Sequence, residues 1–99
     1  MKISSGNFYY LYITTNPGKT VFYTGMTNDL KRRLFEHYTS RGDDKHFVSK
    51  YHCYKLIYFE IYDTAFEAIA REKEVKNLTR EKKINLIKTK NAKMNFLVI

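Results

Sequence analysis

The sequence predicts an α+β fold, a small three-stranded sheet flanked by helices in the order ββ-α-β-α-α. Two aromatic and β-branched segments precede the first helical segment, a third follows it, and two segments that begin with helix-capping residues come last. The chain has 99 residues, of which 43% are hydrophobic and 16% aromatic, as is typical of a single globular domain spanning residues 1–99.

The first two strands are expected at residues 8–14 and 20–24, joined as a hairpin. The first strand is apolar at both alternating positions, which is typical of a central strand covered on both faces. Asn16, Pro17 and Gly18 predict the turn, because proline fixes φ and glycine tolerates a positive φ. The second strand is expected to end in a turn at Gly25.

A helix is expected next, at residues 28–38, because apolar side chains recur on one face at Leu30, Leu34 and Tyr38. Its N-cap is one of three polar residues, Thr27, Asn28 or Asp29. A polar loop at 39–50 and a strand at 54–61 are expected to follow. The next element is a helix at 65–77, capped by Asp63 or Thr64 with Glu67 as capping partner, and after it a helix runs from its cap Thr79 to about residue 88 with Ile84 and Ile87 facing inward. The apolar tail at 94–99 can add a short strand.

The charge of the chain favours an anionic partner. The formal net charge is +8, which makes nucleic acid the first candidate and a solvated basic surface the alternative. The last third of the chain is especially rich in lysine and arginine, as expected of a track for phosphate groups or of solvated helix faces. The residues expected to contact nucleic acid are Arg32, Lys73, Lys76, Arg80, Lys82 and Lys83.

Composition also argues against several classes of protein. Cys53 is the only cysteine, which excludes an intramolecular disulfide and argues against a zinc site ligated by cysteines. No apolar run approaches the length of a membrane span, and residues 4–7 are polar, unlike the apolar core of a signal peptide. We therefore expect a cytoplasmic protein with no membrane partner.

The helix at 65–77 carries a charged residue where an apolar one is expected. Glu72 falls in the middle of an arc of apolar residues formed by Ala65, Ala68, Ile69 and Val75. A carboxylate on a buried face requires a cationic partner or a metal ion. Glu72 is therefore either a metal-binding or catalytic residue, or one half of an ion pair with Arg33 or a neighbouring lysine.

The first helix and the hairpin supply groups that can handle a phosphate. Arg33 and His37 are one helical turn apart; a guanidinium binds phosphate in a bidentate manner, and an imidazole moves a proton near neutral pH. The alternative for His37 is a half-buried side chain bonded to the backbone. Tyr12 and Tyr23 are expected on one face of the hairpin, with Tyr10 beside Tyr12, where a tyrosine is also commonly a core residue.

The spacing of these residues resembles that of the GIY-YIG nuclease superfamily, most closely its small stand-alone bacterial-type members. The first signature triplet corresponds to residues 10–12 (Tyr-Leu-Tyr), with tyrosine in place of the family's glycine. The second corresponds to residues 23–25 (Tyr-Thr-Gly). Arg33 follows where the family has its arginine, and His37 where many members have histidine or tyrosine.

The resemblance extends over most of the chain, from about residue 8 to residue 91. Glu72 lies in a segment similar to the one that holds the family's metal-binding glutamate, and Asn91 lies near the family's late asparagine. The chain differs from the small members at two positions, where Leu78 replaces a tryptophan and Ala92 replaces a proline.

The resemblance implies hydrolysis of a phosphodiester bond with one divalent ion, Mg²⁺ or Mn²⁺, held by Glu72. Arg33 would offset the charge that develops on the phosphoryl oxygens. Tyr12 or Tyr23 would orient or deprotonate the attacking water, with its pKa lowered by nearby cations, and His37 would assist proton transfer or bind phosphate.

The expected function is cleavage of DNA, which is favoured over RNA. We expect structure-selective or weakly specific cutting, because family members often obtain specificity from attached DNA-binding domains that this chain does not carry. The alternative is a nucleic-acid-binding module with weak catalysis that uses the basic C-terminal helices, and a third interpretation is an interaction domain for an acidic protein.

Overall fold

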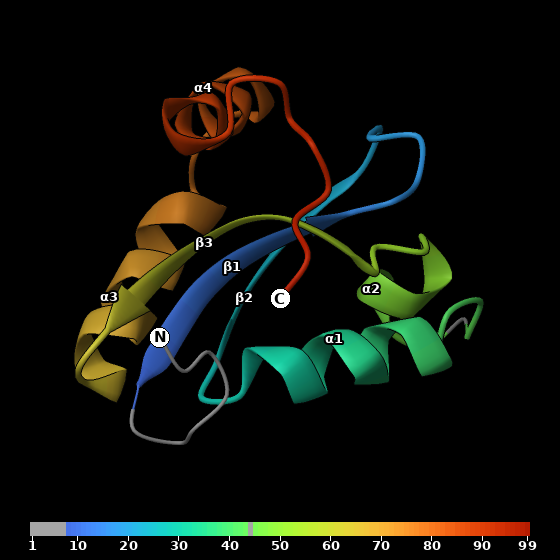
Figure 1. Cartoon of the computed structure of the whole chain (residues 1–99), viewed down its shortest axis with the longest axis horizontal. Helices are drawn as coiled ribbons and strands as arrows, with labels where there is room; N and C mark the ends of the chain where they lie inside the picture. Colours follow the sequence, from blue (N-terminus) through green and yellow to red (C-terminus); the bar gives the residue numbers. More distant parts are fainter. Residues whose placement is uncertain (1–7, 44) are drawn as a thin grey trace.

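The computed structural model describes residues 8–43 and 45–99, and it confirms the predicted α+β fold (Figure 1). Residues 4–7, on which the prediction about a signal peptide depends, lie outside these ranges. The elements in chain order are β1 (Tyr9–Thr15), β2 (Phe22–Thr27), α1 (Leu30–Thr39), α2 (Phe47–Lys50), β3 (Lys55–Tyr62), α3 (Ala65–Lys76) and α4 (Arg80–Lys90).

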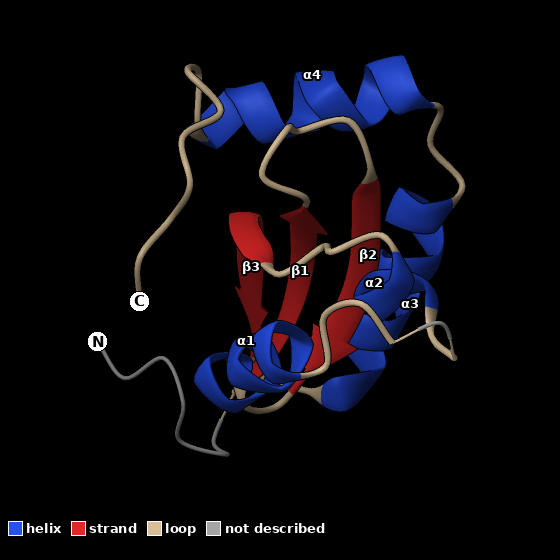
Figure 2. Cartoon of the chain, turned by 90° about the vertical axis from the view of Figure 1, so that its right-hand side faces the viewer, coloured by secondary structure: helices blue, strands red, loops and turns tan. Residues whose placement is uncertain are grey.

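The sheet is antiparallel with strand order β2-β1-β3, so β1 is the central strand, as its apolar character on both faces predicts (Figure 2). Alternate residues of β1 point to opposite faces and belong to two separate cores. Leu11 and Ile13 pack with residues of α3 and α4, whereas Tyr10 and Tyr12 pack with Leu30 of α1. Helices α1 and α3 therefore cover opposite faces of the sheet.

Strand β2 does not turn at Gly25, contrary to the sequence-based expectation, but continues to Thr27. Gly25 lies opposite Tyr12 in the register of the two strands. A Cβ atom at Gly25 would lie 2.5 Å from the Tyr12 hydroxyl oxygen and 2.6 Å from its ring carbon Cζ. The glycine is thus required by the close approach of a tyrosine ring rather than by a turn. Helix α1 begins afterwards, with Asp29 as its N-cap.

The hairpin turn also differs in detail from its prediction. Lys19, not Gly18, has the positive φ, of 57°. The Asn16 side chain explains this shift, because its Oδ1 atom accepts the N–H groups of Thr20 and Val21 at 2.8 and 3.0 Å. These two bonds hold the backbone after the turn in place, as asparagine side chains commonly do.

The predicted polar loop at 39–50 contains the short helix α2, which the sequence pattern did not reveal. Tertiary contacts stabilise it: Val48 and Ser49 are buried, and the Ser49 hydroxyl lies 2.7 Å from that of Ser40 at the end of α1. The Val48 carbonyl accepts the N–H of Cys53 at 2.8 Å. A four-residue helix has too little periodicity to be recognised from sequence.

The later helices begin where their capping residues predict. The hydroxyl of Thr64 accepts the N–H of Glu67, and that of Thr79 accepts the N–H of Lys82. Two residues assigned to apolar faces are exposed: Ile69 is 41% accessible, and Tyr38 is 46% accessible at the end of α1. The buried face of α3 is narrower than predicted because only Ala68 and Val75 are fully covered by the sheet.

The C-terminal tail forms no strand but lies against β3. The N–H of Leu97 donates to the carbonyl of Leu56 at 2.8 Å. Asn91 ends α4, and its side-chain amide donates to the carbonyls of Ile57 and Asn95. Within the described ranges, none of the helices has the length and apolar character needed to span a bilayer.

Candidate active site

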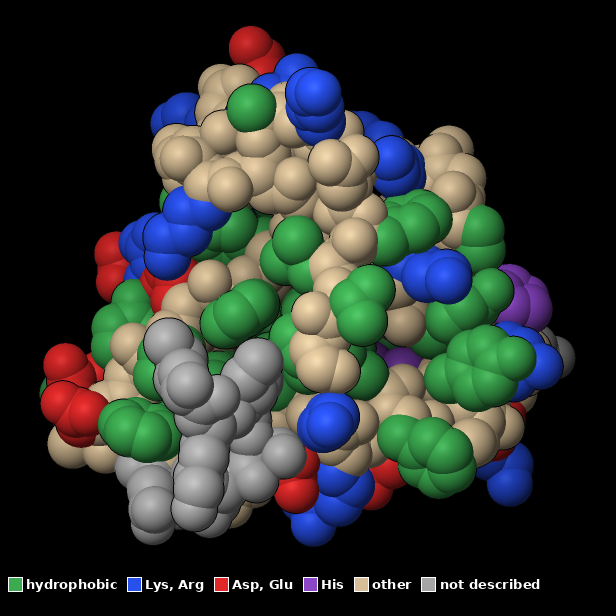
Figure 3. All heavy atoms as spheres, in the orientation of Figure 1, with side chains coloured by type: hydrophobic (Ala, Val, Ile, Leu, Met, Phe, Trp, Pro, Cys, Tyr) green, Lys and Arg blue, Asp and Glu red, His purple; other side chains and the backbone are tan. Residues whose placement is uncertain are grey.

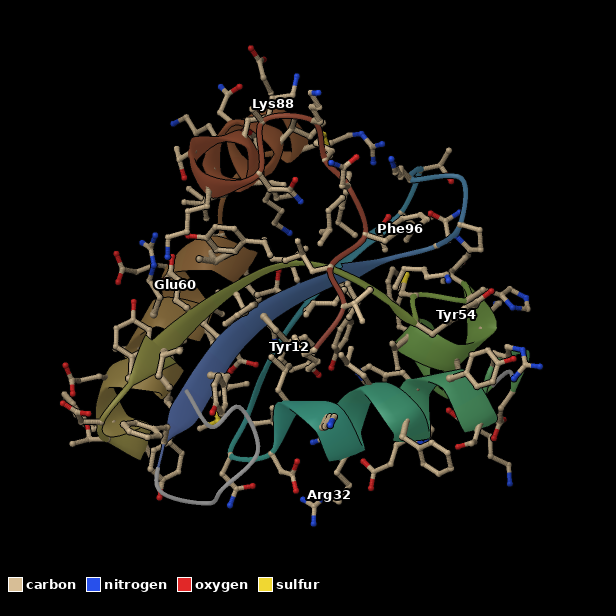
Figure 4. All side chains as sticks on the ribbon, viewed as in Figure 1. Tyr12, Arg32, Tyr54, Glu60, Lys88 and Phe96 are labelled. Atoms are coloured by element: carbon tan, nitrogen blue, oxygen red, sulfur yellow. The ribbon has the colours of Figure 1, made fainter. Side chains whose placement is uncertain are left out.

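A buried hydrogen bond between β1 and α1 forms the centre of the site. The Tyr12 hydroxyl lies 3.0 Å from Nε2 of His37, and the two rings are 5.8 Å apart. Tyr12 is 1% exposed and His37 is 5% exposed. Tyr12 comes from the central strand, and Gly25 allows its ring to lie across β2 (Figure 4). A tyrosine and a histidine 25 positions apart are thus joined in a water-poor setting.

Both partners of this bond are neutral at pH 7. Burial, together with the nearby Arg33 guanidinium, lowers the pKa of His37 to about 4. Burial, assisted by the neighbouring Tyr23, raises the pKa of Tyr12 above its ordinary value. Arg33 acts in the expected direction on Tyr12, but burial outweighs it. The expectation that His37 titrates near neutral pH is therefore wrong, and the neutral imidazole either accepts the Tyr12 O–H at Nε2 or, in its other tautomer, donates to the phenol oxygen.

An open cavity of about 420 Å³ adjoins this hydrogen bond. The ring of Tyr23 meets His37 edge-on at 5.8 Å and lies 6.3 Å from Tyr12. Three predicted site residues, Tyr23, Arg33 and His37, line the cavity. Its other lining residues were not identified from the sequence: Glu36, Ser40, His46, Phe47, Val48 and Ser49.

Arg33 lies at the exposed side of the cavity, with 45% of its side chain accessible. Its Nη1 atom donates to Oε1 of Glu36 at 3.4 Å. Glu36 is three positions after Arg33, a spacing at which helical side chains meet, so this pair had a recognisable signal in the sequence. The exposed ion pair leaves most of the guanidinium fork accessible to an anion, because a long, exposed contact of this kind is weak.

Glu72 approaches from the other face of the sheet. It belongs to α3, which contacts β1 and β2, and it is not among the described residues that line the cavity. Its side chain is 22% exposed, and its Oε2 atom pairs with Lys76 at 3.4 Å. The Glu72 charge nevertheless acts on the Tyr12 hydroxyl, which relates it to the site electrostatically. No group of three or more potential metal ligands occurs among residues 8–43 and 45–99.

The residues expected to contact nucleic acid lie on three different helices. Arg32 points away from Tyr12 into solvent, on the far side of α1 (Figure 4), and Lys73 and Lys82 are exposed on α3 and α4. Arg80 has a structural contact, because its Nη1 atom donates to the carbonyl of Thr20 at 2.7 Å. Lys83 is half-buried, and Lys76 is the partner of Glu72. Lysine and arginine side chains gather over α4 in Figure 3.

A second charged cluster, which was not predicted, joins β3 to α3. The Glu60 side chain is 11% exposed and accepts two bonds from Arg71, at 2.9 and 3.1 Å. The hydroxyls of Tyr58 and Tyr62 also donate to it. Burial raises the pKa of the Glu60 carboxyl, but the hydrogen bonds from Arg71, Tyr58 and Tyr62 outweigh burial and hold this pKa below its ordinary value. The signal in the sequence was an acid within an otherwise apolar strand, the same kind of exception as Glu72 within its helix.

Comparison with known proteins identifies the family. A family model described as the GIY-YIG catalytic domain matches residues 8–85. The chain belongs to the GIY-YIG family. The matched range includes the candidate site residues Tyr12, Tyr23, Arg33, His37 and Glu72, whereas Asn91 lies beyond it.

Relatives of this GIY-YIG chain occur in archaea and bacteria. A UPF0213 protein of Haloquadratum walsbyi is 36% identical over 80 residues, which cover 81% of this chain and 86% of the relative. A UPF0213 protein of Clostridium perfringens is 36% identical over 84 residues, which cover 85% and 87%. The solution NMR structure of a UPF0213 protein from Bacillus halodurans matches with a TM-score of 0.55 at 29% identity, covering 87% of this chain and 88% of that one. The family supports a nuclease-type function that acts on nucleic acid.

Proposed function

We propose that this GIY-YIG protein is an endonuclease that hydrolyses phosphodiester bonds in DNA with one divalent ion, Mg²⁺ or Mn²⁺, and that it acts as a single catalytic domain in the cytoplasm. The observation that carries the proposal is the convergence of a phenol, a guanidinium and an imidazole on one open cavity, from Tyr23, Arg33 and His37. This set of groups can bind a phosphate and manage a proton.

Glu72 has the chemistry to hold the divalent ion. Its carboxylate is partly exposed, and its charge acts on the Tyr12 hydroxyl from the opposite face of the sheet. Mg²⁺ commonly uses one or two carboxylates and completes its shell with water and substrate phosphate oxygens, so one glutamate fits this ion. Lys76 would have to yield its contact with Oε2, and its own side chain is 52% exposed, so it can turn to solvent. An ion bound by Glu72 would supply charge that polarises a phosphate group lying between this carboxylate and the cavity, and it would stabilise the leaving oxygen.

Arg33 and Tyr23 are the groups that face the substrate. The Arg33 guanidinium is accessible and can bind two phosphoryl oxygens, where it offsets the charge that develops during hydrolysis. Tyr23 lines the same cavity, and we assign its hydroxyl the role of orienting the attacking water. These two roles require no change in the fold around the cavity.

We assign to the Tyr12–His37 pair the removal of the proton from the attacking water. In the tautomer whose Nε2 carries no hydrogen, His37 can take the phenolic proton as the Tyr12 hydroxyl oxygen receives one from water; because its pKa is low, the imidazole passes the proton on to the cavity that it lines rather than keeping it. A phenol with a raised pKa is a poor base by itself. The pair avoids this difficulty because no free phenolate has to persist.

DNA cleavage by the purified chain tests the proposal. Branched, nicked and single-stranded DNA are incubated with Mg²⁺ or Mn²⁺, and we expect nicking that falls by a factor of about 10² to 10³ in Arg33→Ala and at least as far in Glu72→Gln. Glu81→Gln, an exposed glutamate on α4, is the matched control and should retain activity. Failure to cut any substrate with either ion would contradict the proposal. Salt-sensitive DNA binding that is unchanged in Glu72→Gln would then favour the alternative, a binding module.

A further inference from the structure

Three aromatic rings form a continuous row that leads out of the cavity. Tyr23 of β2 is stacked with Phe47 of α2, with 6.3 Å between ring centres and 27° between ring planes. Phe47 in turn lies 4.7 Å from the ring of Tyr51. Tyr23 and Phe47 both line the cavity with Arg33. We call Tyr23, Phe47 and Tyr51 the aromatic row.

The outer part of the aromatic row is unusually accessible for aromatic side chains. Phe47 is 50% exposed and Tyr51 is 42% exposed. Hydrophobic side chains gather over α1 and α2 on the face shown in Figure 3, with lysine and arginine side chains beside them. Isolated exposed rings need no explanation, but adjoining rings at the rim of a cavity indicate a binding surface.

Cations accompany these rings. The Lys50 ammonium lies 5.6 Å from the centre of the Tyr51 ring, and the Arg41 guanidinium lies 3.8 Å from the centre of the Tyr38 ring, which is also exposed. Asp43 is an exposed acid in the same segment, and Glu36 is already held by Arg33. Exposed aromatic rings next to positive charge are the features with which proteins bind single-stranded nucleic acid, whereas an apolar protein partner does not require the cations.

We propose that the aromatic row binds unpaired bases, so that DNA with single-stranded or frayed nucleotides at the cleavage position is the preferred substrate. A base within a duplex is stacked on both sides and cannot also cover Phe47, whereas an unpaired base can. Because Phe47 and Arg33 line one cavity, a base on Phe47 brings an adjoining phosphate to the guanidinium. The proposal rests on the proposed function only for the role of that phosphate.

A tryptophan at position 47 provides a direct probe, because the chain has no tryptophan of its own. In Phe47→Trp, without metal, we expect saturable quenching of the indole fluorescence by an oligothymidylate and little quenching by a blunt duplex. Phe66→Trp is the matched control, since Phe66 is 81% exposed on α3, away from the cavity. Equal quenching by both DNAs, or quenching at position 66 as large as at position 47, would overturn the proposal.

Affinity provides the second measurement. Phe47→Leu should weaken binding of the oligothymidylate about tenfold and binding of the duplex less than about twofold, since one stacked base is lost. Phe66→Leu should change neither, and circular dichroism verifies that each variant is folded. An equal loss for both DNAs, or none, contradicts the proposal. Cleavage that depends on Glu72 but is indifferent to Phe47 refutes this inference alone; a single-strand preference without any cleavage refutes the proposed function alone.

Discussion

Replacement of Gly25 by alanine tests whether the site depends on a tyrosine ring that crosses β2. The new Cβ atom would lie 2.5 Å from the Tyr12 hydroxyl oxygen, whereas ordinary contacts begin at 3.4 Å. The hydroxyl must therefore retreat by about 1 Å, which a buried ring can do only by disturbing its neighbours. That movement breaks the 3.0 Å hydrogen bond to His37.

The expected loss of stability follows from two contributions. Overpacking of a well-packed core costs about 1–3 kcal/mol. A buried donor and acceptor left without partners cost about 1–3 kcal/mol more. Alanine regains about 0.5–1 kcal/mol relative to glycine in a strand. The midpoints of these ranges give an expected loss for Gly25→Ala of about 3 kcal/mol in the free energy of unfolding, or roughly 12–24 °C in the melting temperature.

Urea denaturation followed by circular dichroism measures this loss. Gly18→Ala is the matched control, because its Cβ atom would meet nothing closer than 3.8 Å. Tyr12→Val removes the ring, so Gly25→Ala in that background should cost less than about 0.5 kcal/mol, and the double-mutant cycle isolates the clash. A cost for Gly25→Ala that equals that of Gly18→Ala, or that persists in full without the ring, would refute the reasoning.

The remaining predictions concern charged groups. The pKa of His37 is about 4 in the folded chain and near 6.5 when unfolded, so the unfolded chain binds the proton first as pH falls. The free energy of unfolding should therefore fall by about 2–3 kcal/mol between pH 6.5 and pH 4. In urea denaturation the stability of His37→Gln should depend less steeply on pH, and equal slopes for the variant and the original chain would contradict this. Arg71→Leu leaves the Glu60 carboxylate without its bidentate partner and should cost about 2–3 kcal/mol by thermal unfolding, against little for Glu74→Ala, whose carboxylate is 66% exposed. Lys82→Ala should reduce the slope of log affinity against log salt by about 1 for any DNA sequence; an unchanged slope would remove Lys82 from the contact surface.

Much of the fold could be predicted because local signals carried it. Apolar character on both faces identified β1 as central, and the capping threonines fixed where α3 and α4 begin. Helix α2 could not be predicted, because it depends on burial of Val48 against other elements. Gly25 was identified as important but for the wrong reason, since the demand on it comes from a residue on another strand.

The candidate site was predictable to a similar extent. The four-residue spacing of Arg33 and His37 brings both to one cavity, as helix geometry requires. The protonation of His37 and Tyr12 was not predictable, because burial, rather than the nearest charge, determines it. Phe47 was missed because its place at the rim arises only when α2 docks against the Tyr23 ring.

The position of the C-terminal tail has a consequence for solubility. β3 is an outer strand, and outer strands invite pairing with a second chain through their unused backbone groups. The Leu97 N–H and the Asn91 amide donate to the carbonyls of Leu56 and Ile57, so these two acceptors of β3 are already engaged. The C-terminal tail thus covers part of the outer edge of β3 and shortens the stretch along which a neighbouring molecule could add a strand.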